Sequence, residues 1–155
     1  MRPAVFLFLT VCEDIFSCPN SLTGVYWKHS MEDQQKKQIL IAEDDKFLSS
    51  LLKAKLEKEG FAVLQAYDGE DVLAVLKTAH PACILLDVIM PKISGFEVLK
   101  AISVDPRINT IPILMLTNLA QESDMEKAKQ LGAREYLVKV KNSVDAIVAK
   151  IKALV

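Results

Sequence analysis

Short, continuously apolar runs alternate with amphipathic segments from Gln38 to the last residue. The first run is 39–42, and a segment with helical spacing of its apolar residues follows it until Gly60. A strand buried on both faces is apolar at every position. A helix that covers a sheet instead has an apolar residue about every 3.6 residues, which places these residues on one face. The pattern recurs five times, which predicts five consecutive strand–helix units.

The predicted elements fill this part of the chain without a long gap. Predicted strands are 39–42, 62–66, 83–86, 111–116 and 135–138. Predicted helices are 46–59, one that opens at Asp68-Gly69 and closes at His80-Pro81, 94–102, 121–131 and 144–154. The apolar face of the first helix is expected to hold Phe47, Leu48, Leu51, Leu52 and Leu56. Right-handed crossovers then predict an α/β fold, a doubly wound five-stranded parallel sheet of (βα)5 type with strand order 2-1-3-4-5.

The first 30 residues lack this pattern. Residues 4–11 resemble a short secretory apolar region, but acidic residues follow at once and the run is too short to span a bilayer. We interpret 1–30 as an extension that is disordered or results from a misassigned start, with Met31 as the natural start; a membrane tether is a further alternative. Residues 31–155 are then one domain.

Charge and cysteine content narrow the class of partner. The net charge is -1 and no basic patch or DNA-binding element follows the last helix, so neither nucleic acid nor membrane is expected as a partner. The three cysteines, Cys12, Cys18 and Cys83, form no disulfide framework. We therefore expect a cytoplasmic, stand-alone domain that acts through protein contacts.

Polar residues follow the predicted strands where each strand ends. Glu43 and Asp44 follow the first strand, Asp87 the third, Thr117 the fourth and Lys139 the fifth. Each alone has a plainer interpretation, such as a solvated charge or a turn residue. Because parallel strands end at one edge of the sheet, these groups are expected to converge there. Crowded carboxylates favour a divalent cation, and oxygen ligands suit Mg²⁺ or Mn²⁺. A lysine beside them suits phosphoryl transfer.

Four sequence motifs carry a specific resemblance. They are ILIAEDD (39–45), ILLDVIMPKISGFEVL (84–99), ILMLTN (113–118) and GAREYLVK (132–139). In content and order they resemble the receiver domains of response regulators, in particular the chemotaxis-type single-domain regulators of two-component systems, which have a flavodoxin-like fold. Asp45 is interpreted as the cap of the first helix.

The resemblance implies a phosphoacceptor and a metal site. Asp87 would accept a phosphoryl group from a sensor histidine kinase or a phosphotransfer protein. Asp44 and Asp87 would bind Mg²⁺ directly, Glu43 would hold it through water, and the backbone carbonyl of Ile89 would supply a further ligand. The protein would then be a phosphorylation switch and not an enzyme.

The resemblance also implies a switch. Lys139 would pair with Asp87 and then with the phosphoryl group, while Thr117 would hydrogen-bond another phosphoryl oxygen and Tyr136 would turn inward. Output is expected at the face of the fourth helix, fifth strand and fifth helix, where a downstream protein would bind. That face is expected to hold Lys127, Arg134 and Lys141.

Several positions depart from the family pattern. Val140 replaces the usual proline after the lysine, so a trans bond or a strained turn is expected there. Asn118 stands where a very small residue is usual and would crowd the phosphoryl pocket or hydrogen-bond to it. Ile89 and Leu119 are apolar, which suggests that they shield the acyl phosphate and slow self-dephosphorylation.

Two other functions compete with this interpretation. A degenerate receiver would act as a docking module without phosphorylation. A phosphatase with an aspartyl nucleophile would need an acid at the position of Ile89, which the sequence lacks.

Overall fold

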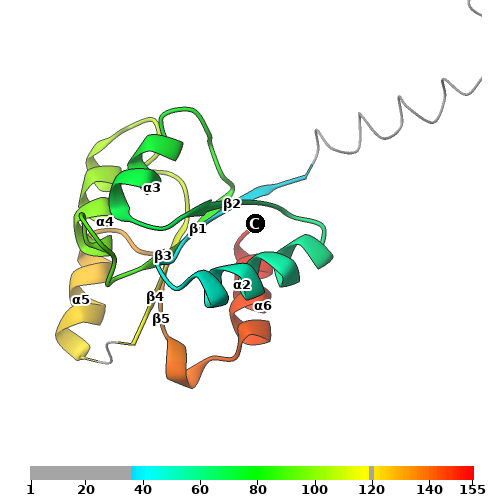
Figure 1. Cartoon of the computed structure of the whole chain (residues 1–155). Helices are drawn as coiled ribbons and strands as arrows, with labels where there is room; N and C mark the ends of the chain where they lie inside the picture. The colour runs from blue at the N-terminus through cyan, green and yellow to red at the C-terminus, as the bar shows by residue number, and fades with distance from the viewer. Residues whose placement is uncertain (1–35, 119–120) are drawn as a thin grey trace, which may run out of the picture. The chain divides into compact units, whose positions relative to one another are not determined.

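The sheet has five parallel strands in the order β2-β1-β3-β4-β5, which confirms the predicted topology. The computed structural model describes residues 36–118 and 121–155 (Figure 1). The strands are β1 (Gln38–Ala42), β2 (Ala62–Ala66), β3 (Cys83–Asp87), β4 (Ile113–Thr117) and β5 (Glu135–Val138). The helices are α2 (Lys46–Lys58), α3 (Gly69–Val75), α4 (Gly95–Val104), α5 (Glu122–Gln130) and α6 (Val144–Leu154), with a short 3₁₀ turn η1 (Lys139–Lys141) before α6.

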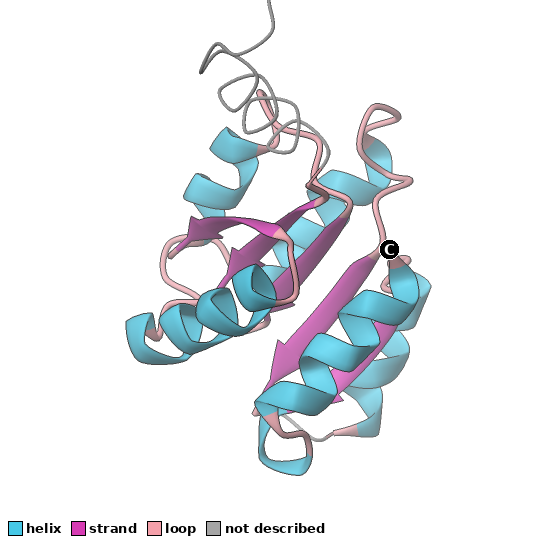
Figure 2. Cartoon of the chain, turned by 90° about the vertical axis from the view of Figure 1, so that its right-hand side faces the viewer, coloured by secondary structure: helices cyan, strands magenta, loops and turns pink. Residues whose placement is uncertain are grey.

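Helices cover both faces of the sheet. In Figures 1 and 2, α3, α4 and α5 lie on one face, and α2 and α6 lie side by side on the other. Each face has its own apolar core, in which the side chains of the strands alternate between the two layers. All residues of β3 and β4 are buried, because both strands are covered on both sides.

The winding reverses direction between β1 and β3. β1 pairs with β2 on one side and with β3 on the other, so the loops after β1 and β3 turn to opposite faces of the sheet. In sheets of this kind ligands bind at the carboxyl ends of the strands beside that reversal. A ligand site is therefore expected at the residues that follow Ala42 and at Asp87.

Side-chain caps fix the starts of four helices. Asp45 accepts hydrogen bonds from the backbone N–H of Phe47 and of Leu48, which confirms its predicted role. Asp68, Ser94 and Ser143 cap α3, α4 and α6 in the same way. The exception is α5, which begins after Gln121 without a side-chain cap and buries only Ala128 among its residues. The α5 helix is thus the most weakly anchored of the five.

Three details of the sequence prediction were wrong. The second helix, α3, ends at Val75 and does not continue to His80. Phe47 is 80% exposed and Leu51 38% exposed, because the buried stripe of α2 runs through Leu52 and Leu56. At about 100° per residue, Phe47 lies nearly opposite that stripe and Leu51 lies well to one side of it. The fourth strand begins at Ile113 and not at residue 111, so Pro112 precedes it.

The predictions for residues 1–30, including a start at Met31, lie outside the described residues. Within 36–118 and 121–155, no helix is long and apolar enough to cross a membrane.

Gly95, the first residue of α4, lies directly against the end of β3. A Cβ built on it would overlap the backbone carbonyl of Asp87, and the Gly95 N–H donates to the Val88 carbonyl at 2.9 Å. Gly95→Ala is expected to lower the free energy of unfolding by about 3 kcal/mol, because backbone must shift to admit the methyl group. Urea denaturation measures this loss.

Gly60→Ala is the matched control for that variant. Gly60 has open space around it but a φ of +92°, so the substitution should cost only about 1 kcal/mol. Equal losses in the two variants would contradict the close approach at Gly95.

Candidate functional site

Three carboxylates meet at the carboxyl ends of β1 and β3. One oxygen from each of Glu43, Asp44 and Asp87 lies within 4.8 Å of the others. Glu43 and Asp87 are buried and Asp44 is exposed, so the cluster opens to solvent on the side of Asp44. The predicted convergence of these strand ends is therefore present in the fold.

Lys139 reaches the cluster from the end of β5. Its Nζ donates to Asp87 Oδ2 at 2.6 Å and to Glu43 Oε1 at 2.7 Å. The pairing with Asp87 was expected, whereas the contact with Glu43 was not. No sequence signal identifies this second contact, because it depends on how far Glu43 turns toward β5.

The close charges perturb both Glu43 and Lys139. Burial raises the pKa of the Glu43 carboxyl to about 7, although the hydrogen bond from Lys139 lowers it, and the neighbouring Asp87 charge raises it further. Burial lowers the pKa of Lys139, but its hydrogen bonds with Asp87 and Glu43 outweigh burial, and the pKa is raised. The ammonium therefore stays protonated at neutral pH, while Glu43 is only partly ionised without a further cation.

The donor set suits a hard divalent cation. Three carboxylates face one ammonium, and Glu43 Oε2 is buried without a hydrogen-bond partner among the described residues. An unpartnered buried carboxylate oxygen is costly unless a cation or a bound water satisfies it. Oxygen ligands without a nearby thiolate or imidazole favour Mg²⁺ or Mn²⁺.

The loop after β3 shapes the surroundings of Asp87. The Ile89 N–H donates to Asp87 Oδ1 at 3.2 Å, so each carboxylate oxygen of Asp87 has a donor. Farther along, Lys92 has a φ of 63° and pairs with Asp68 at 2.7 Å and Glu70 at 3.1 Å. These pairs join the loop to the start of α3 and hold it beside the cluster.

Thr117 and Tyr136 lie on adjacent strands. Thr117 is the buried last residue of β4, the strand that pairs with the end of β3. Tyr136 lies on β5, and burial raises the pKa of its phenol, as does the charge of Asp124, while a hydrogen bond with Thr117 lowers it. The predicted switch pair is thus brought together beside the cluster.

Three of the residues that depart from the family pattern lie at the surface, one or two positions after Asp87, Thr117 or Lys139. Ile89 is 58% exposed and Val140 82% exposed, and Asn118 is exposed too. All peptide bonds of the described residues are trans, so the bond before Val140 is trans, as expected, and η1 forms there. Leu119 lies outside the described residues.

Lys127 lies elsewhere than expected. Its ammonium is 4.4 Å from the ring centre of Phe96 on α4. Lys127 therefore faces α4, and the predicted output face of α5, β5 and α6 keeps only the exposed Arg134 and Lys141 of the three cations.

The sequence of the chain is similar to a known protein family and to several of its members. Residues 39–152 match the response regulator receiver domain family. The transcriptional regulatory protein CpxR of Escherichia coli (strain K12) is 42% identical over 117 residues, which cover 76% of this chain and 48% of CpxR. The chain spans about half the length of the curated relatives it matches.

Solved structures share the fold. Chemotaxis response regulator CheY4 of Vibrio cholerae has a TM-score of 0.72 and 27% identity, with 78% of this chain and 100% of that chain covered. The Mn²⁺-bound form of response regulator Rcp1 has a TM-score of 0.69 and 31% identity, with 76% and 92% covered.

Proposed function

The chain belongs to the response regulator receiver domain family of two-component systems, and from this premise we propose that it is a phosphorylation switch whose acceptor is Asp87. The observation that carries the proposal is the contact of Lys139 with a buried Asp87 inside a cluster of three carboxylates. The phosphodonor is proposed to be a sensor histidine kinase or a phosphotransfer protein. A cytoplasmic location and action as a single domain remain predictions.

The proposed reaction is a displacement at phosphorus. One carboxylate oxygen of Asp87 attacks the phosphorus of an N-phosphohistidine on the donor. The new O–P bond forms as the P–N bond breaks, and the bonding pair returns to the imidazole nitrogen. Lys139 contacts the attacking carboxylate from the end of β5, where it balances the charge that the incoming phosphoryl oxygens bring.

The metal would be held by Asp44 and Asp87 directly, by the backbone carbonyl of Ile89, and by Glu43 through water. When bound, Mg²⁺ or Mn²⁺ supplies positive charge to the phosphoryl oxygens. The unpartnered Oε2 of Glu43 and the open side at Asp44 support this assignment. Rcp1, a receiver of similar fold, is described in an Mn²⁺-bound form.

The proposed switch uses Thr117 and Tyr136. A phosphoryl group on Asp87 adds about two negative charges, and the Thr117 hydroxyl can donate to it from the neighbouring strand. That donation competes with the present bond between Thr117 and Tyr136, so the two side chains respond together. A change in the loop after β4 would then alter the surface that a downstream protein contacts.

Phosphoryl uptake tests the proposal. The full chain, incubated with acetyl phosphate and Mg²⁺, is expected to gain one phosphoryl group by intact mass spectrometry, and none in excess EDTA. Absence of uptake from acetyl phosphate and from histidine kinases would favour a phosphorylation-independent docking module instead.

Ile89 is expected to slow loss of the phosphoryl group. Its side chain is 58% exposed beside Asp87, where it can exclude attacking water. Ile89→Asn should speed dephosphorylation about tenfold, since an amide admits and orients water without acting as a full general base. The decay of the purified phosphoprotein in Mg²⁺ measures this rate.

Val104→Asn provides the control, because Val104 is an exposed apolar residue at the far end of α4. An unchanged decay in Ile89→Asn, alone and combined with Leu119→Lys, would reject the shielding hypothesis.

A further inference from the structure

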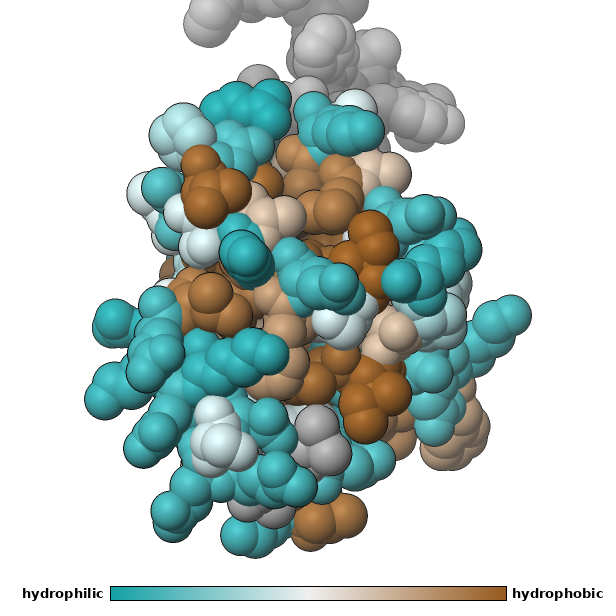
Figure 3. Space-filling view, turned by 90° about the vertical axis from the view of Figure 1, so that its left-hand side faces the viewer, coloured by the Kyte–Doolittle hydropathy of each residue, from teal (hydrophilic) through white to brown (hydrophobic). Residues whose placement is uncertain are grey.

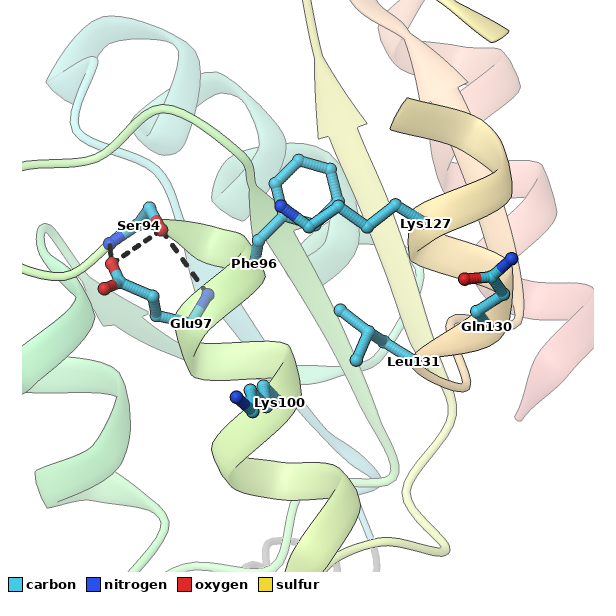
Figure 4. A pocket seen from close by; sticks show the side chains of 7 residues that line it. All are labelled: Ser94, Phe96, Glu97, Lys100, Lys127, Gln130 and Leu131. Carbon is cyan, nitrogen blue, oxygen red and sulfur yellow. Dashed lines mark hydrogen bonds between the residues drawn. The ribbon is translucent and has the colours of Figure 1, made fainter. Parts of the chain in front are cut away.

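A pocket of about 650 Å³ lies between α4 and α5, outside the acidic cluster and on the α4 side of α5, the helix that it shares with the predicted output face (Figure 4). Phe96 of α4 and Leu131, which directly follows α5, supply its apolar lining. Lys100 and Lys127 stand at its sides. Figure 3 shows this side of the molecule, where apolar surface lies among polar surface.

The α4 wall carries a regular stripe. Phe96, Lys100 and Val104 are four residues apart and therefore share one helical face. The stripe is about 12 Å long, at 1.5 Å per residue, and it ends on Val104, which is 75% exposed. Lys127 of α5 and Leu131, the residue that ends this helix, repeat the same spacing. The two helices thus form a groove with apolar residues along it and a cation on each side.

The two cations form no close ion pair in the described part of the chain. Hydrogen bonds with Ser94 lower the pKa of the Glu97 carboxyl, and the charge of Lys127 acts on it in the same direction from a longer distance. The carboxylate of Glu97, which also lines the pocket, accepts instead from the N–H and hydroxyl of Ser94 in the capping box. Lys127 rests over the Phe96 ring, which keeps its charge at the edge of the groove.

We propose that this α4–α5 groove binds an acidic amphipathic helix of a partner protein. Apolar side chains of that helix would contact Phe96, Leu131 and Val104, and its carboxylates would pair with Lys100 and Lys127. This arrangement is helix-in-groove recognition, in which apolar anchors recur at helical spacing and flanking charges select the partner. The proposal does not depend on phosphorylation of Asp87.

A peptide selection tests the groove. A phage library of random helical peptides is selected on the full chain and counter-selected on the Lys100→Glu/Lys127→Glu variant. Enriched peptides are expected to combine apolar residues at helical spacing with Asp or Glu. Synthetic copies should bind the wild-type chain about tenfold more tightly than the double variant. Fluorescence anisotropy with labelled peptide measures both affinities.

Matched variants and competitors make the result decisive. Lys53→Glu/Lys58→Glu changes the net charge equally but lies on α2, on the other face of the sheet, and should leave binding unchanged. Replacing the peptide's acids with lysine should restore binding to the Lys100→Glu/Lys127→Glu variant. Failure to enrich peptides, enrichment of non-acidic peptides, or equal affinity for both chains would overturn the proposal. Displacement of the peptide by micromolar ATP would also overturn it, by indicating a site for small anions.

Discussion

Asp87→Asn is expected to abolish phosphoryl uptake from acetyl phosphate and from any histidine kinase that phosphorylates the wild-type chain. The amide keeps the shape of the side chain but is a far weaker nucleophile than a carboxylate, so no acyl phosphate can form. Lys139 retains Glu43 as a partner at 2.7 Å, and the variant should therefore fold. Intact mass spectrometry after incubation with Mg²⁺ detects the loss.

Asp105→Asn is the control for this result. Asp105 is also ion-paired, with Arg107 at 2.7 Å, but it lies at the far end of α4. It should take up one phosphoryl group as the wild type does. Continued phosphorylation of Asp87→Asn, for example on Asp44, would reject Asp87 as the acceptor.

Lys139→Met is expected to lower the free energy of unfolding of the metal-free protein by about 3 kcal/mol at pH 8, because it leaves two buried carboxylates uncompensated. Lys139 lies 2.6 Å from Asp87 and 2.7 Å from Glu43. The same variant should also take up phosphate at least about a hundredfold more slowly, since a charged donor to the transferring group is lost. Urea denaturation in EDTA and the rate of mass change measure the two effects.

The loss of stability in Lys139→Met is expected to depend on pH because of Glu43. Folding raises the pKa of this carboxyl from 4.5 to about 7. Its contribution to the free energy of unfolding is therefore fully present below pH 4.5 and is lost as the pH rises through 7. Removal of Lys139 takes away an interaction that lowers this pKa. The variant should therefore lose much more stability at pH 8 than at pH 5.

Lys150→Met serves as the control, since it removes a half-exposed pair with Glu135 and should cost less than about 1 kcal/mol at either pH. An equal loss for Lys139→Met at pH 5 and pH 8 would contradict the assignment of the effect to Glu43.

Sequence patterns predicted the topology because the strands are short and mostly apolar, while each helix has most of its apolar residues on one face. They also predicted which groups meet, because the ends of parallel strands necessarily share one edge of the sheet. Asp87, Thr117 and Lys139 could thus be placed together, since the first two are the last residues of β3 and β4 and the third directly follows β5.

The directions of individual side chains could not be predicted from the sequence. The contact between Lys139 and Glu43 depends on rotamers of two long side chains, and no spacing encodes them. The exposure of Phe47 depends on which face of α2 packs on the sheet, and the apolar residues of this helix lie on more than one face. Lys127 turns toward Phe96 because an aromatic face attracts its ammonium across two helices that are far apart in sequence.

The close approach of Gly95 to Asp87 gives the two walls of the α4–α5 groove unequal local stability. α4 is capped and lies directly against the end of β3, so we expect its opening to require far more free energy. α5 lacks a side-chain cap and buries a single alanine, so its separate unfolding requires far less free energy. We therefore expect fluctuations at this side of the domain to be concentrated in α5, while α4 keeps its position beside any bound partner.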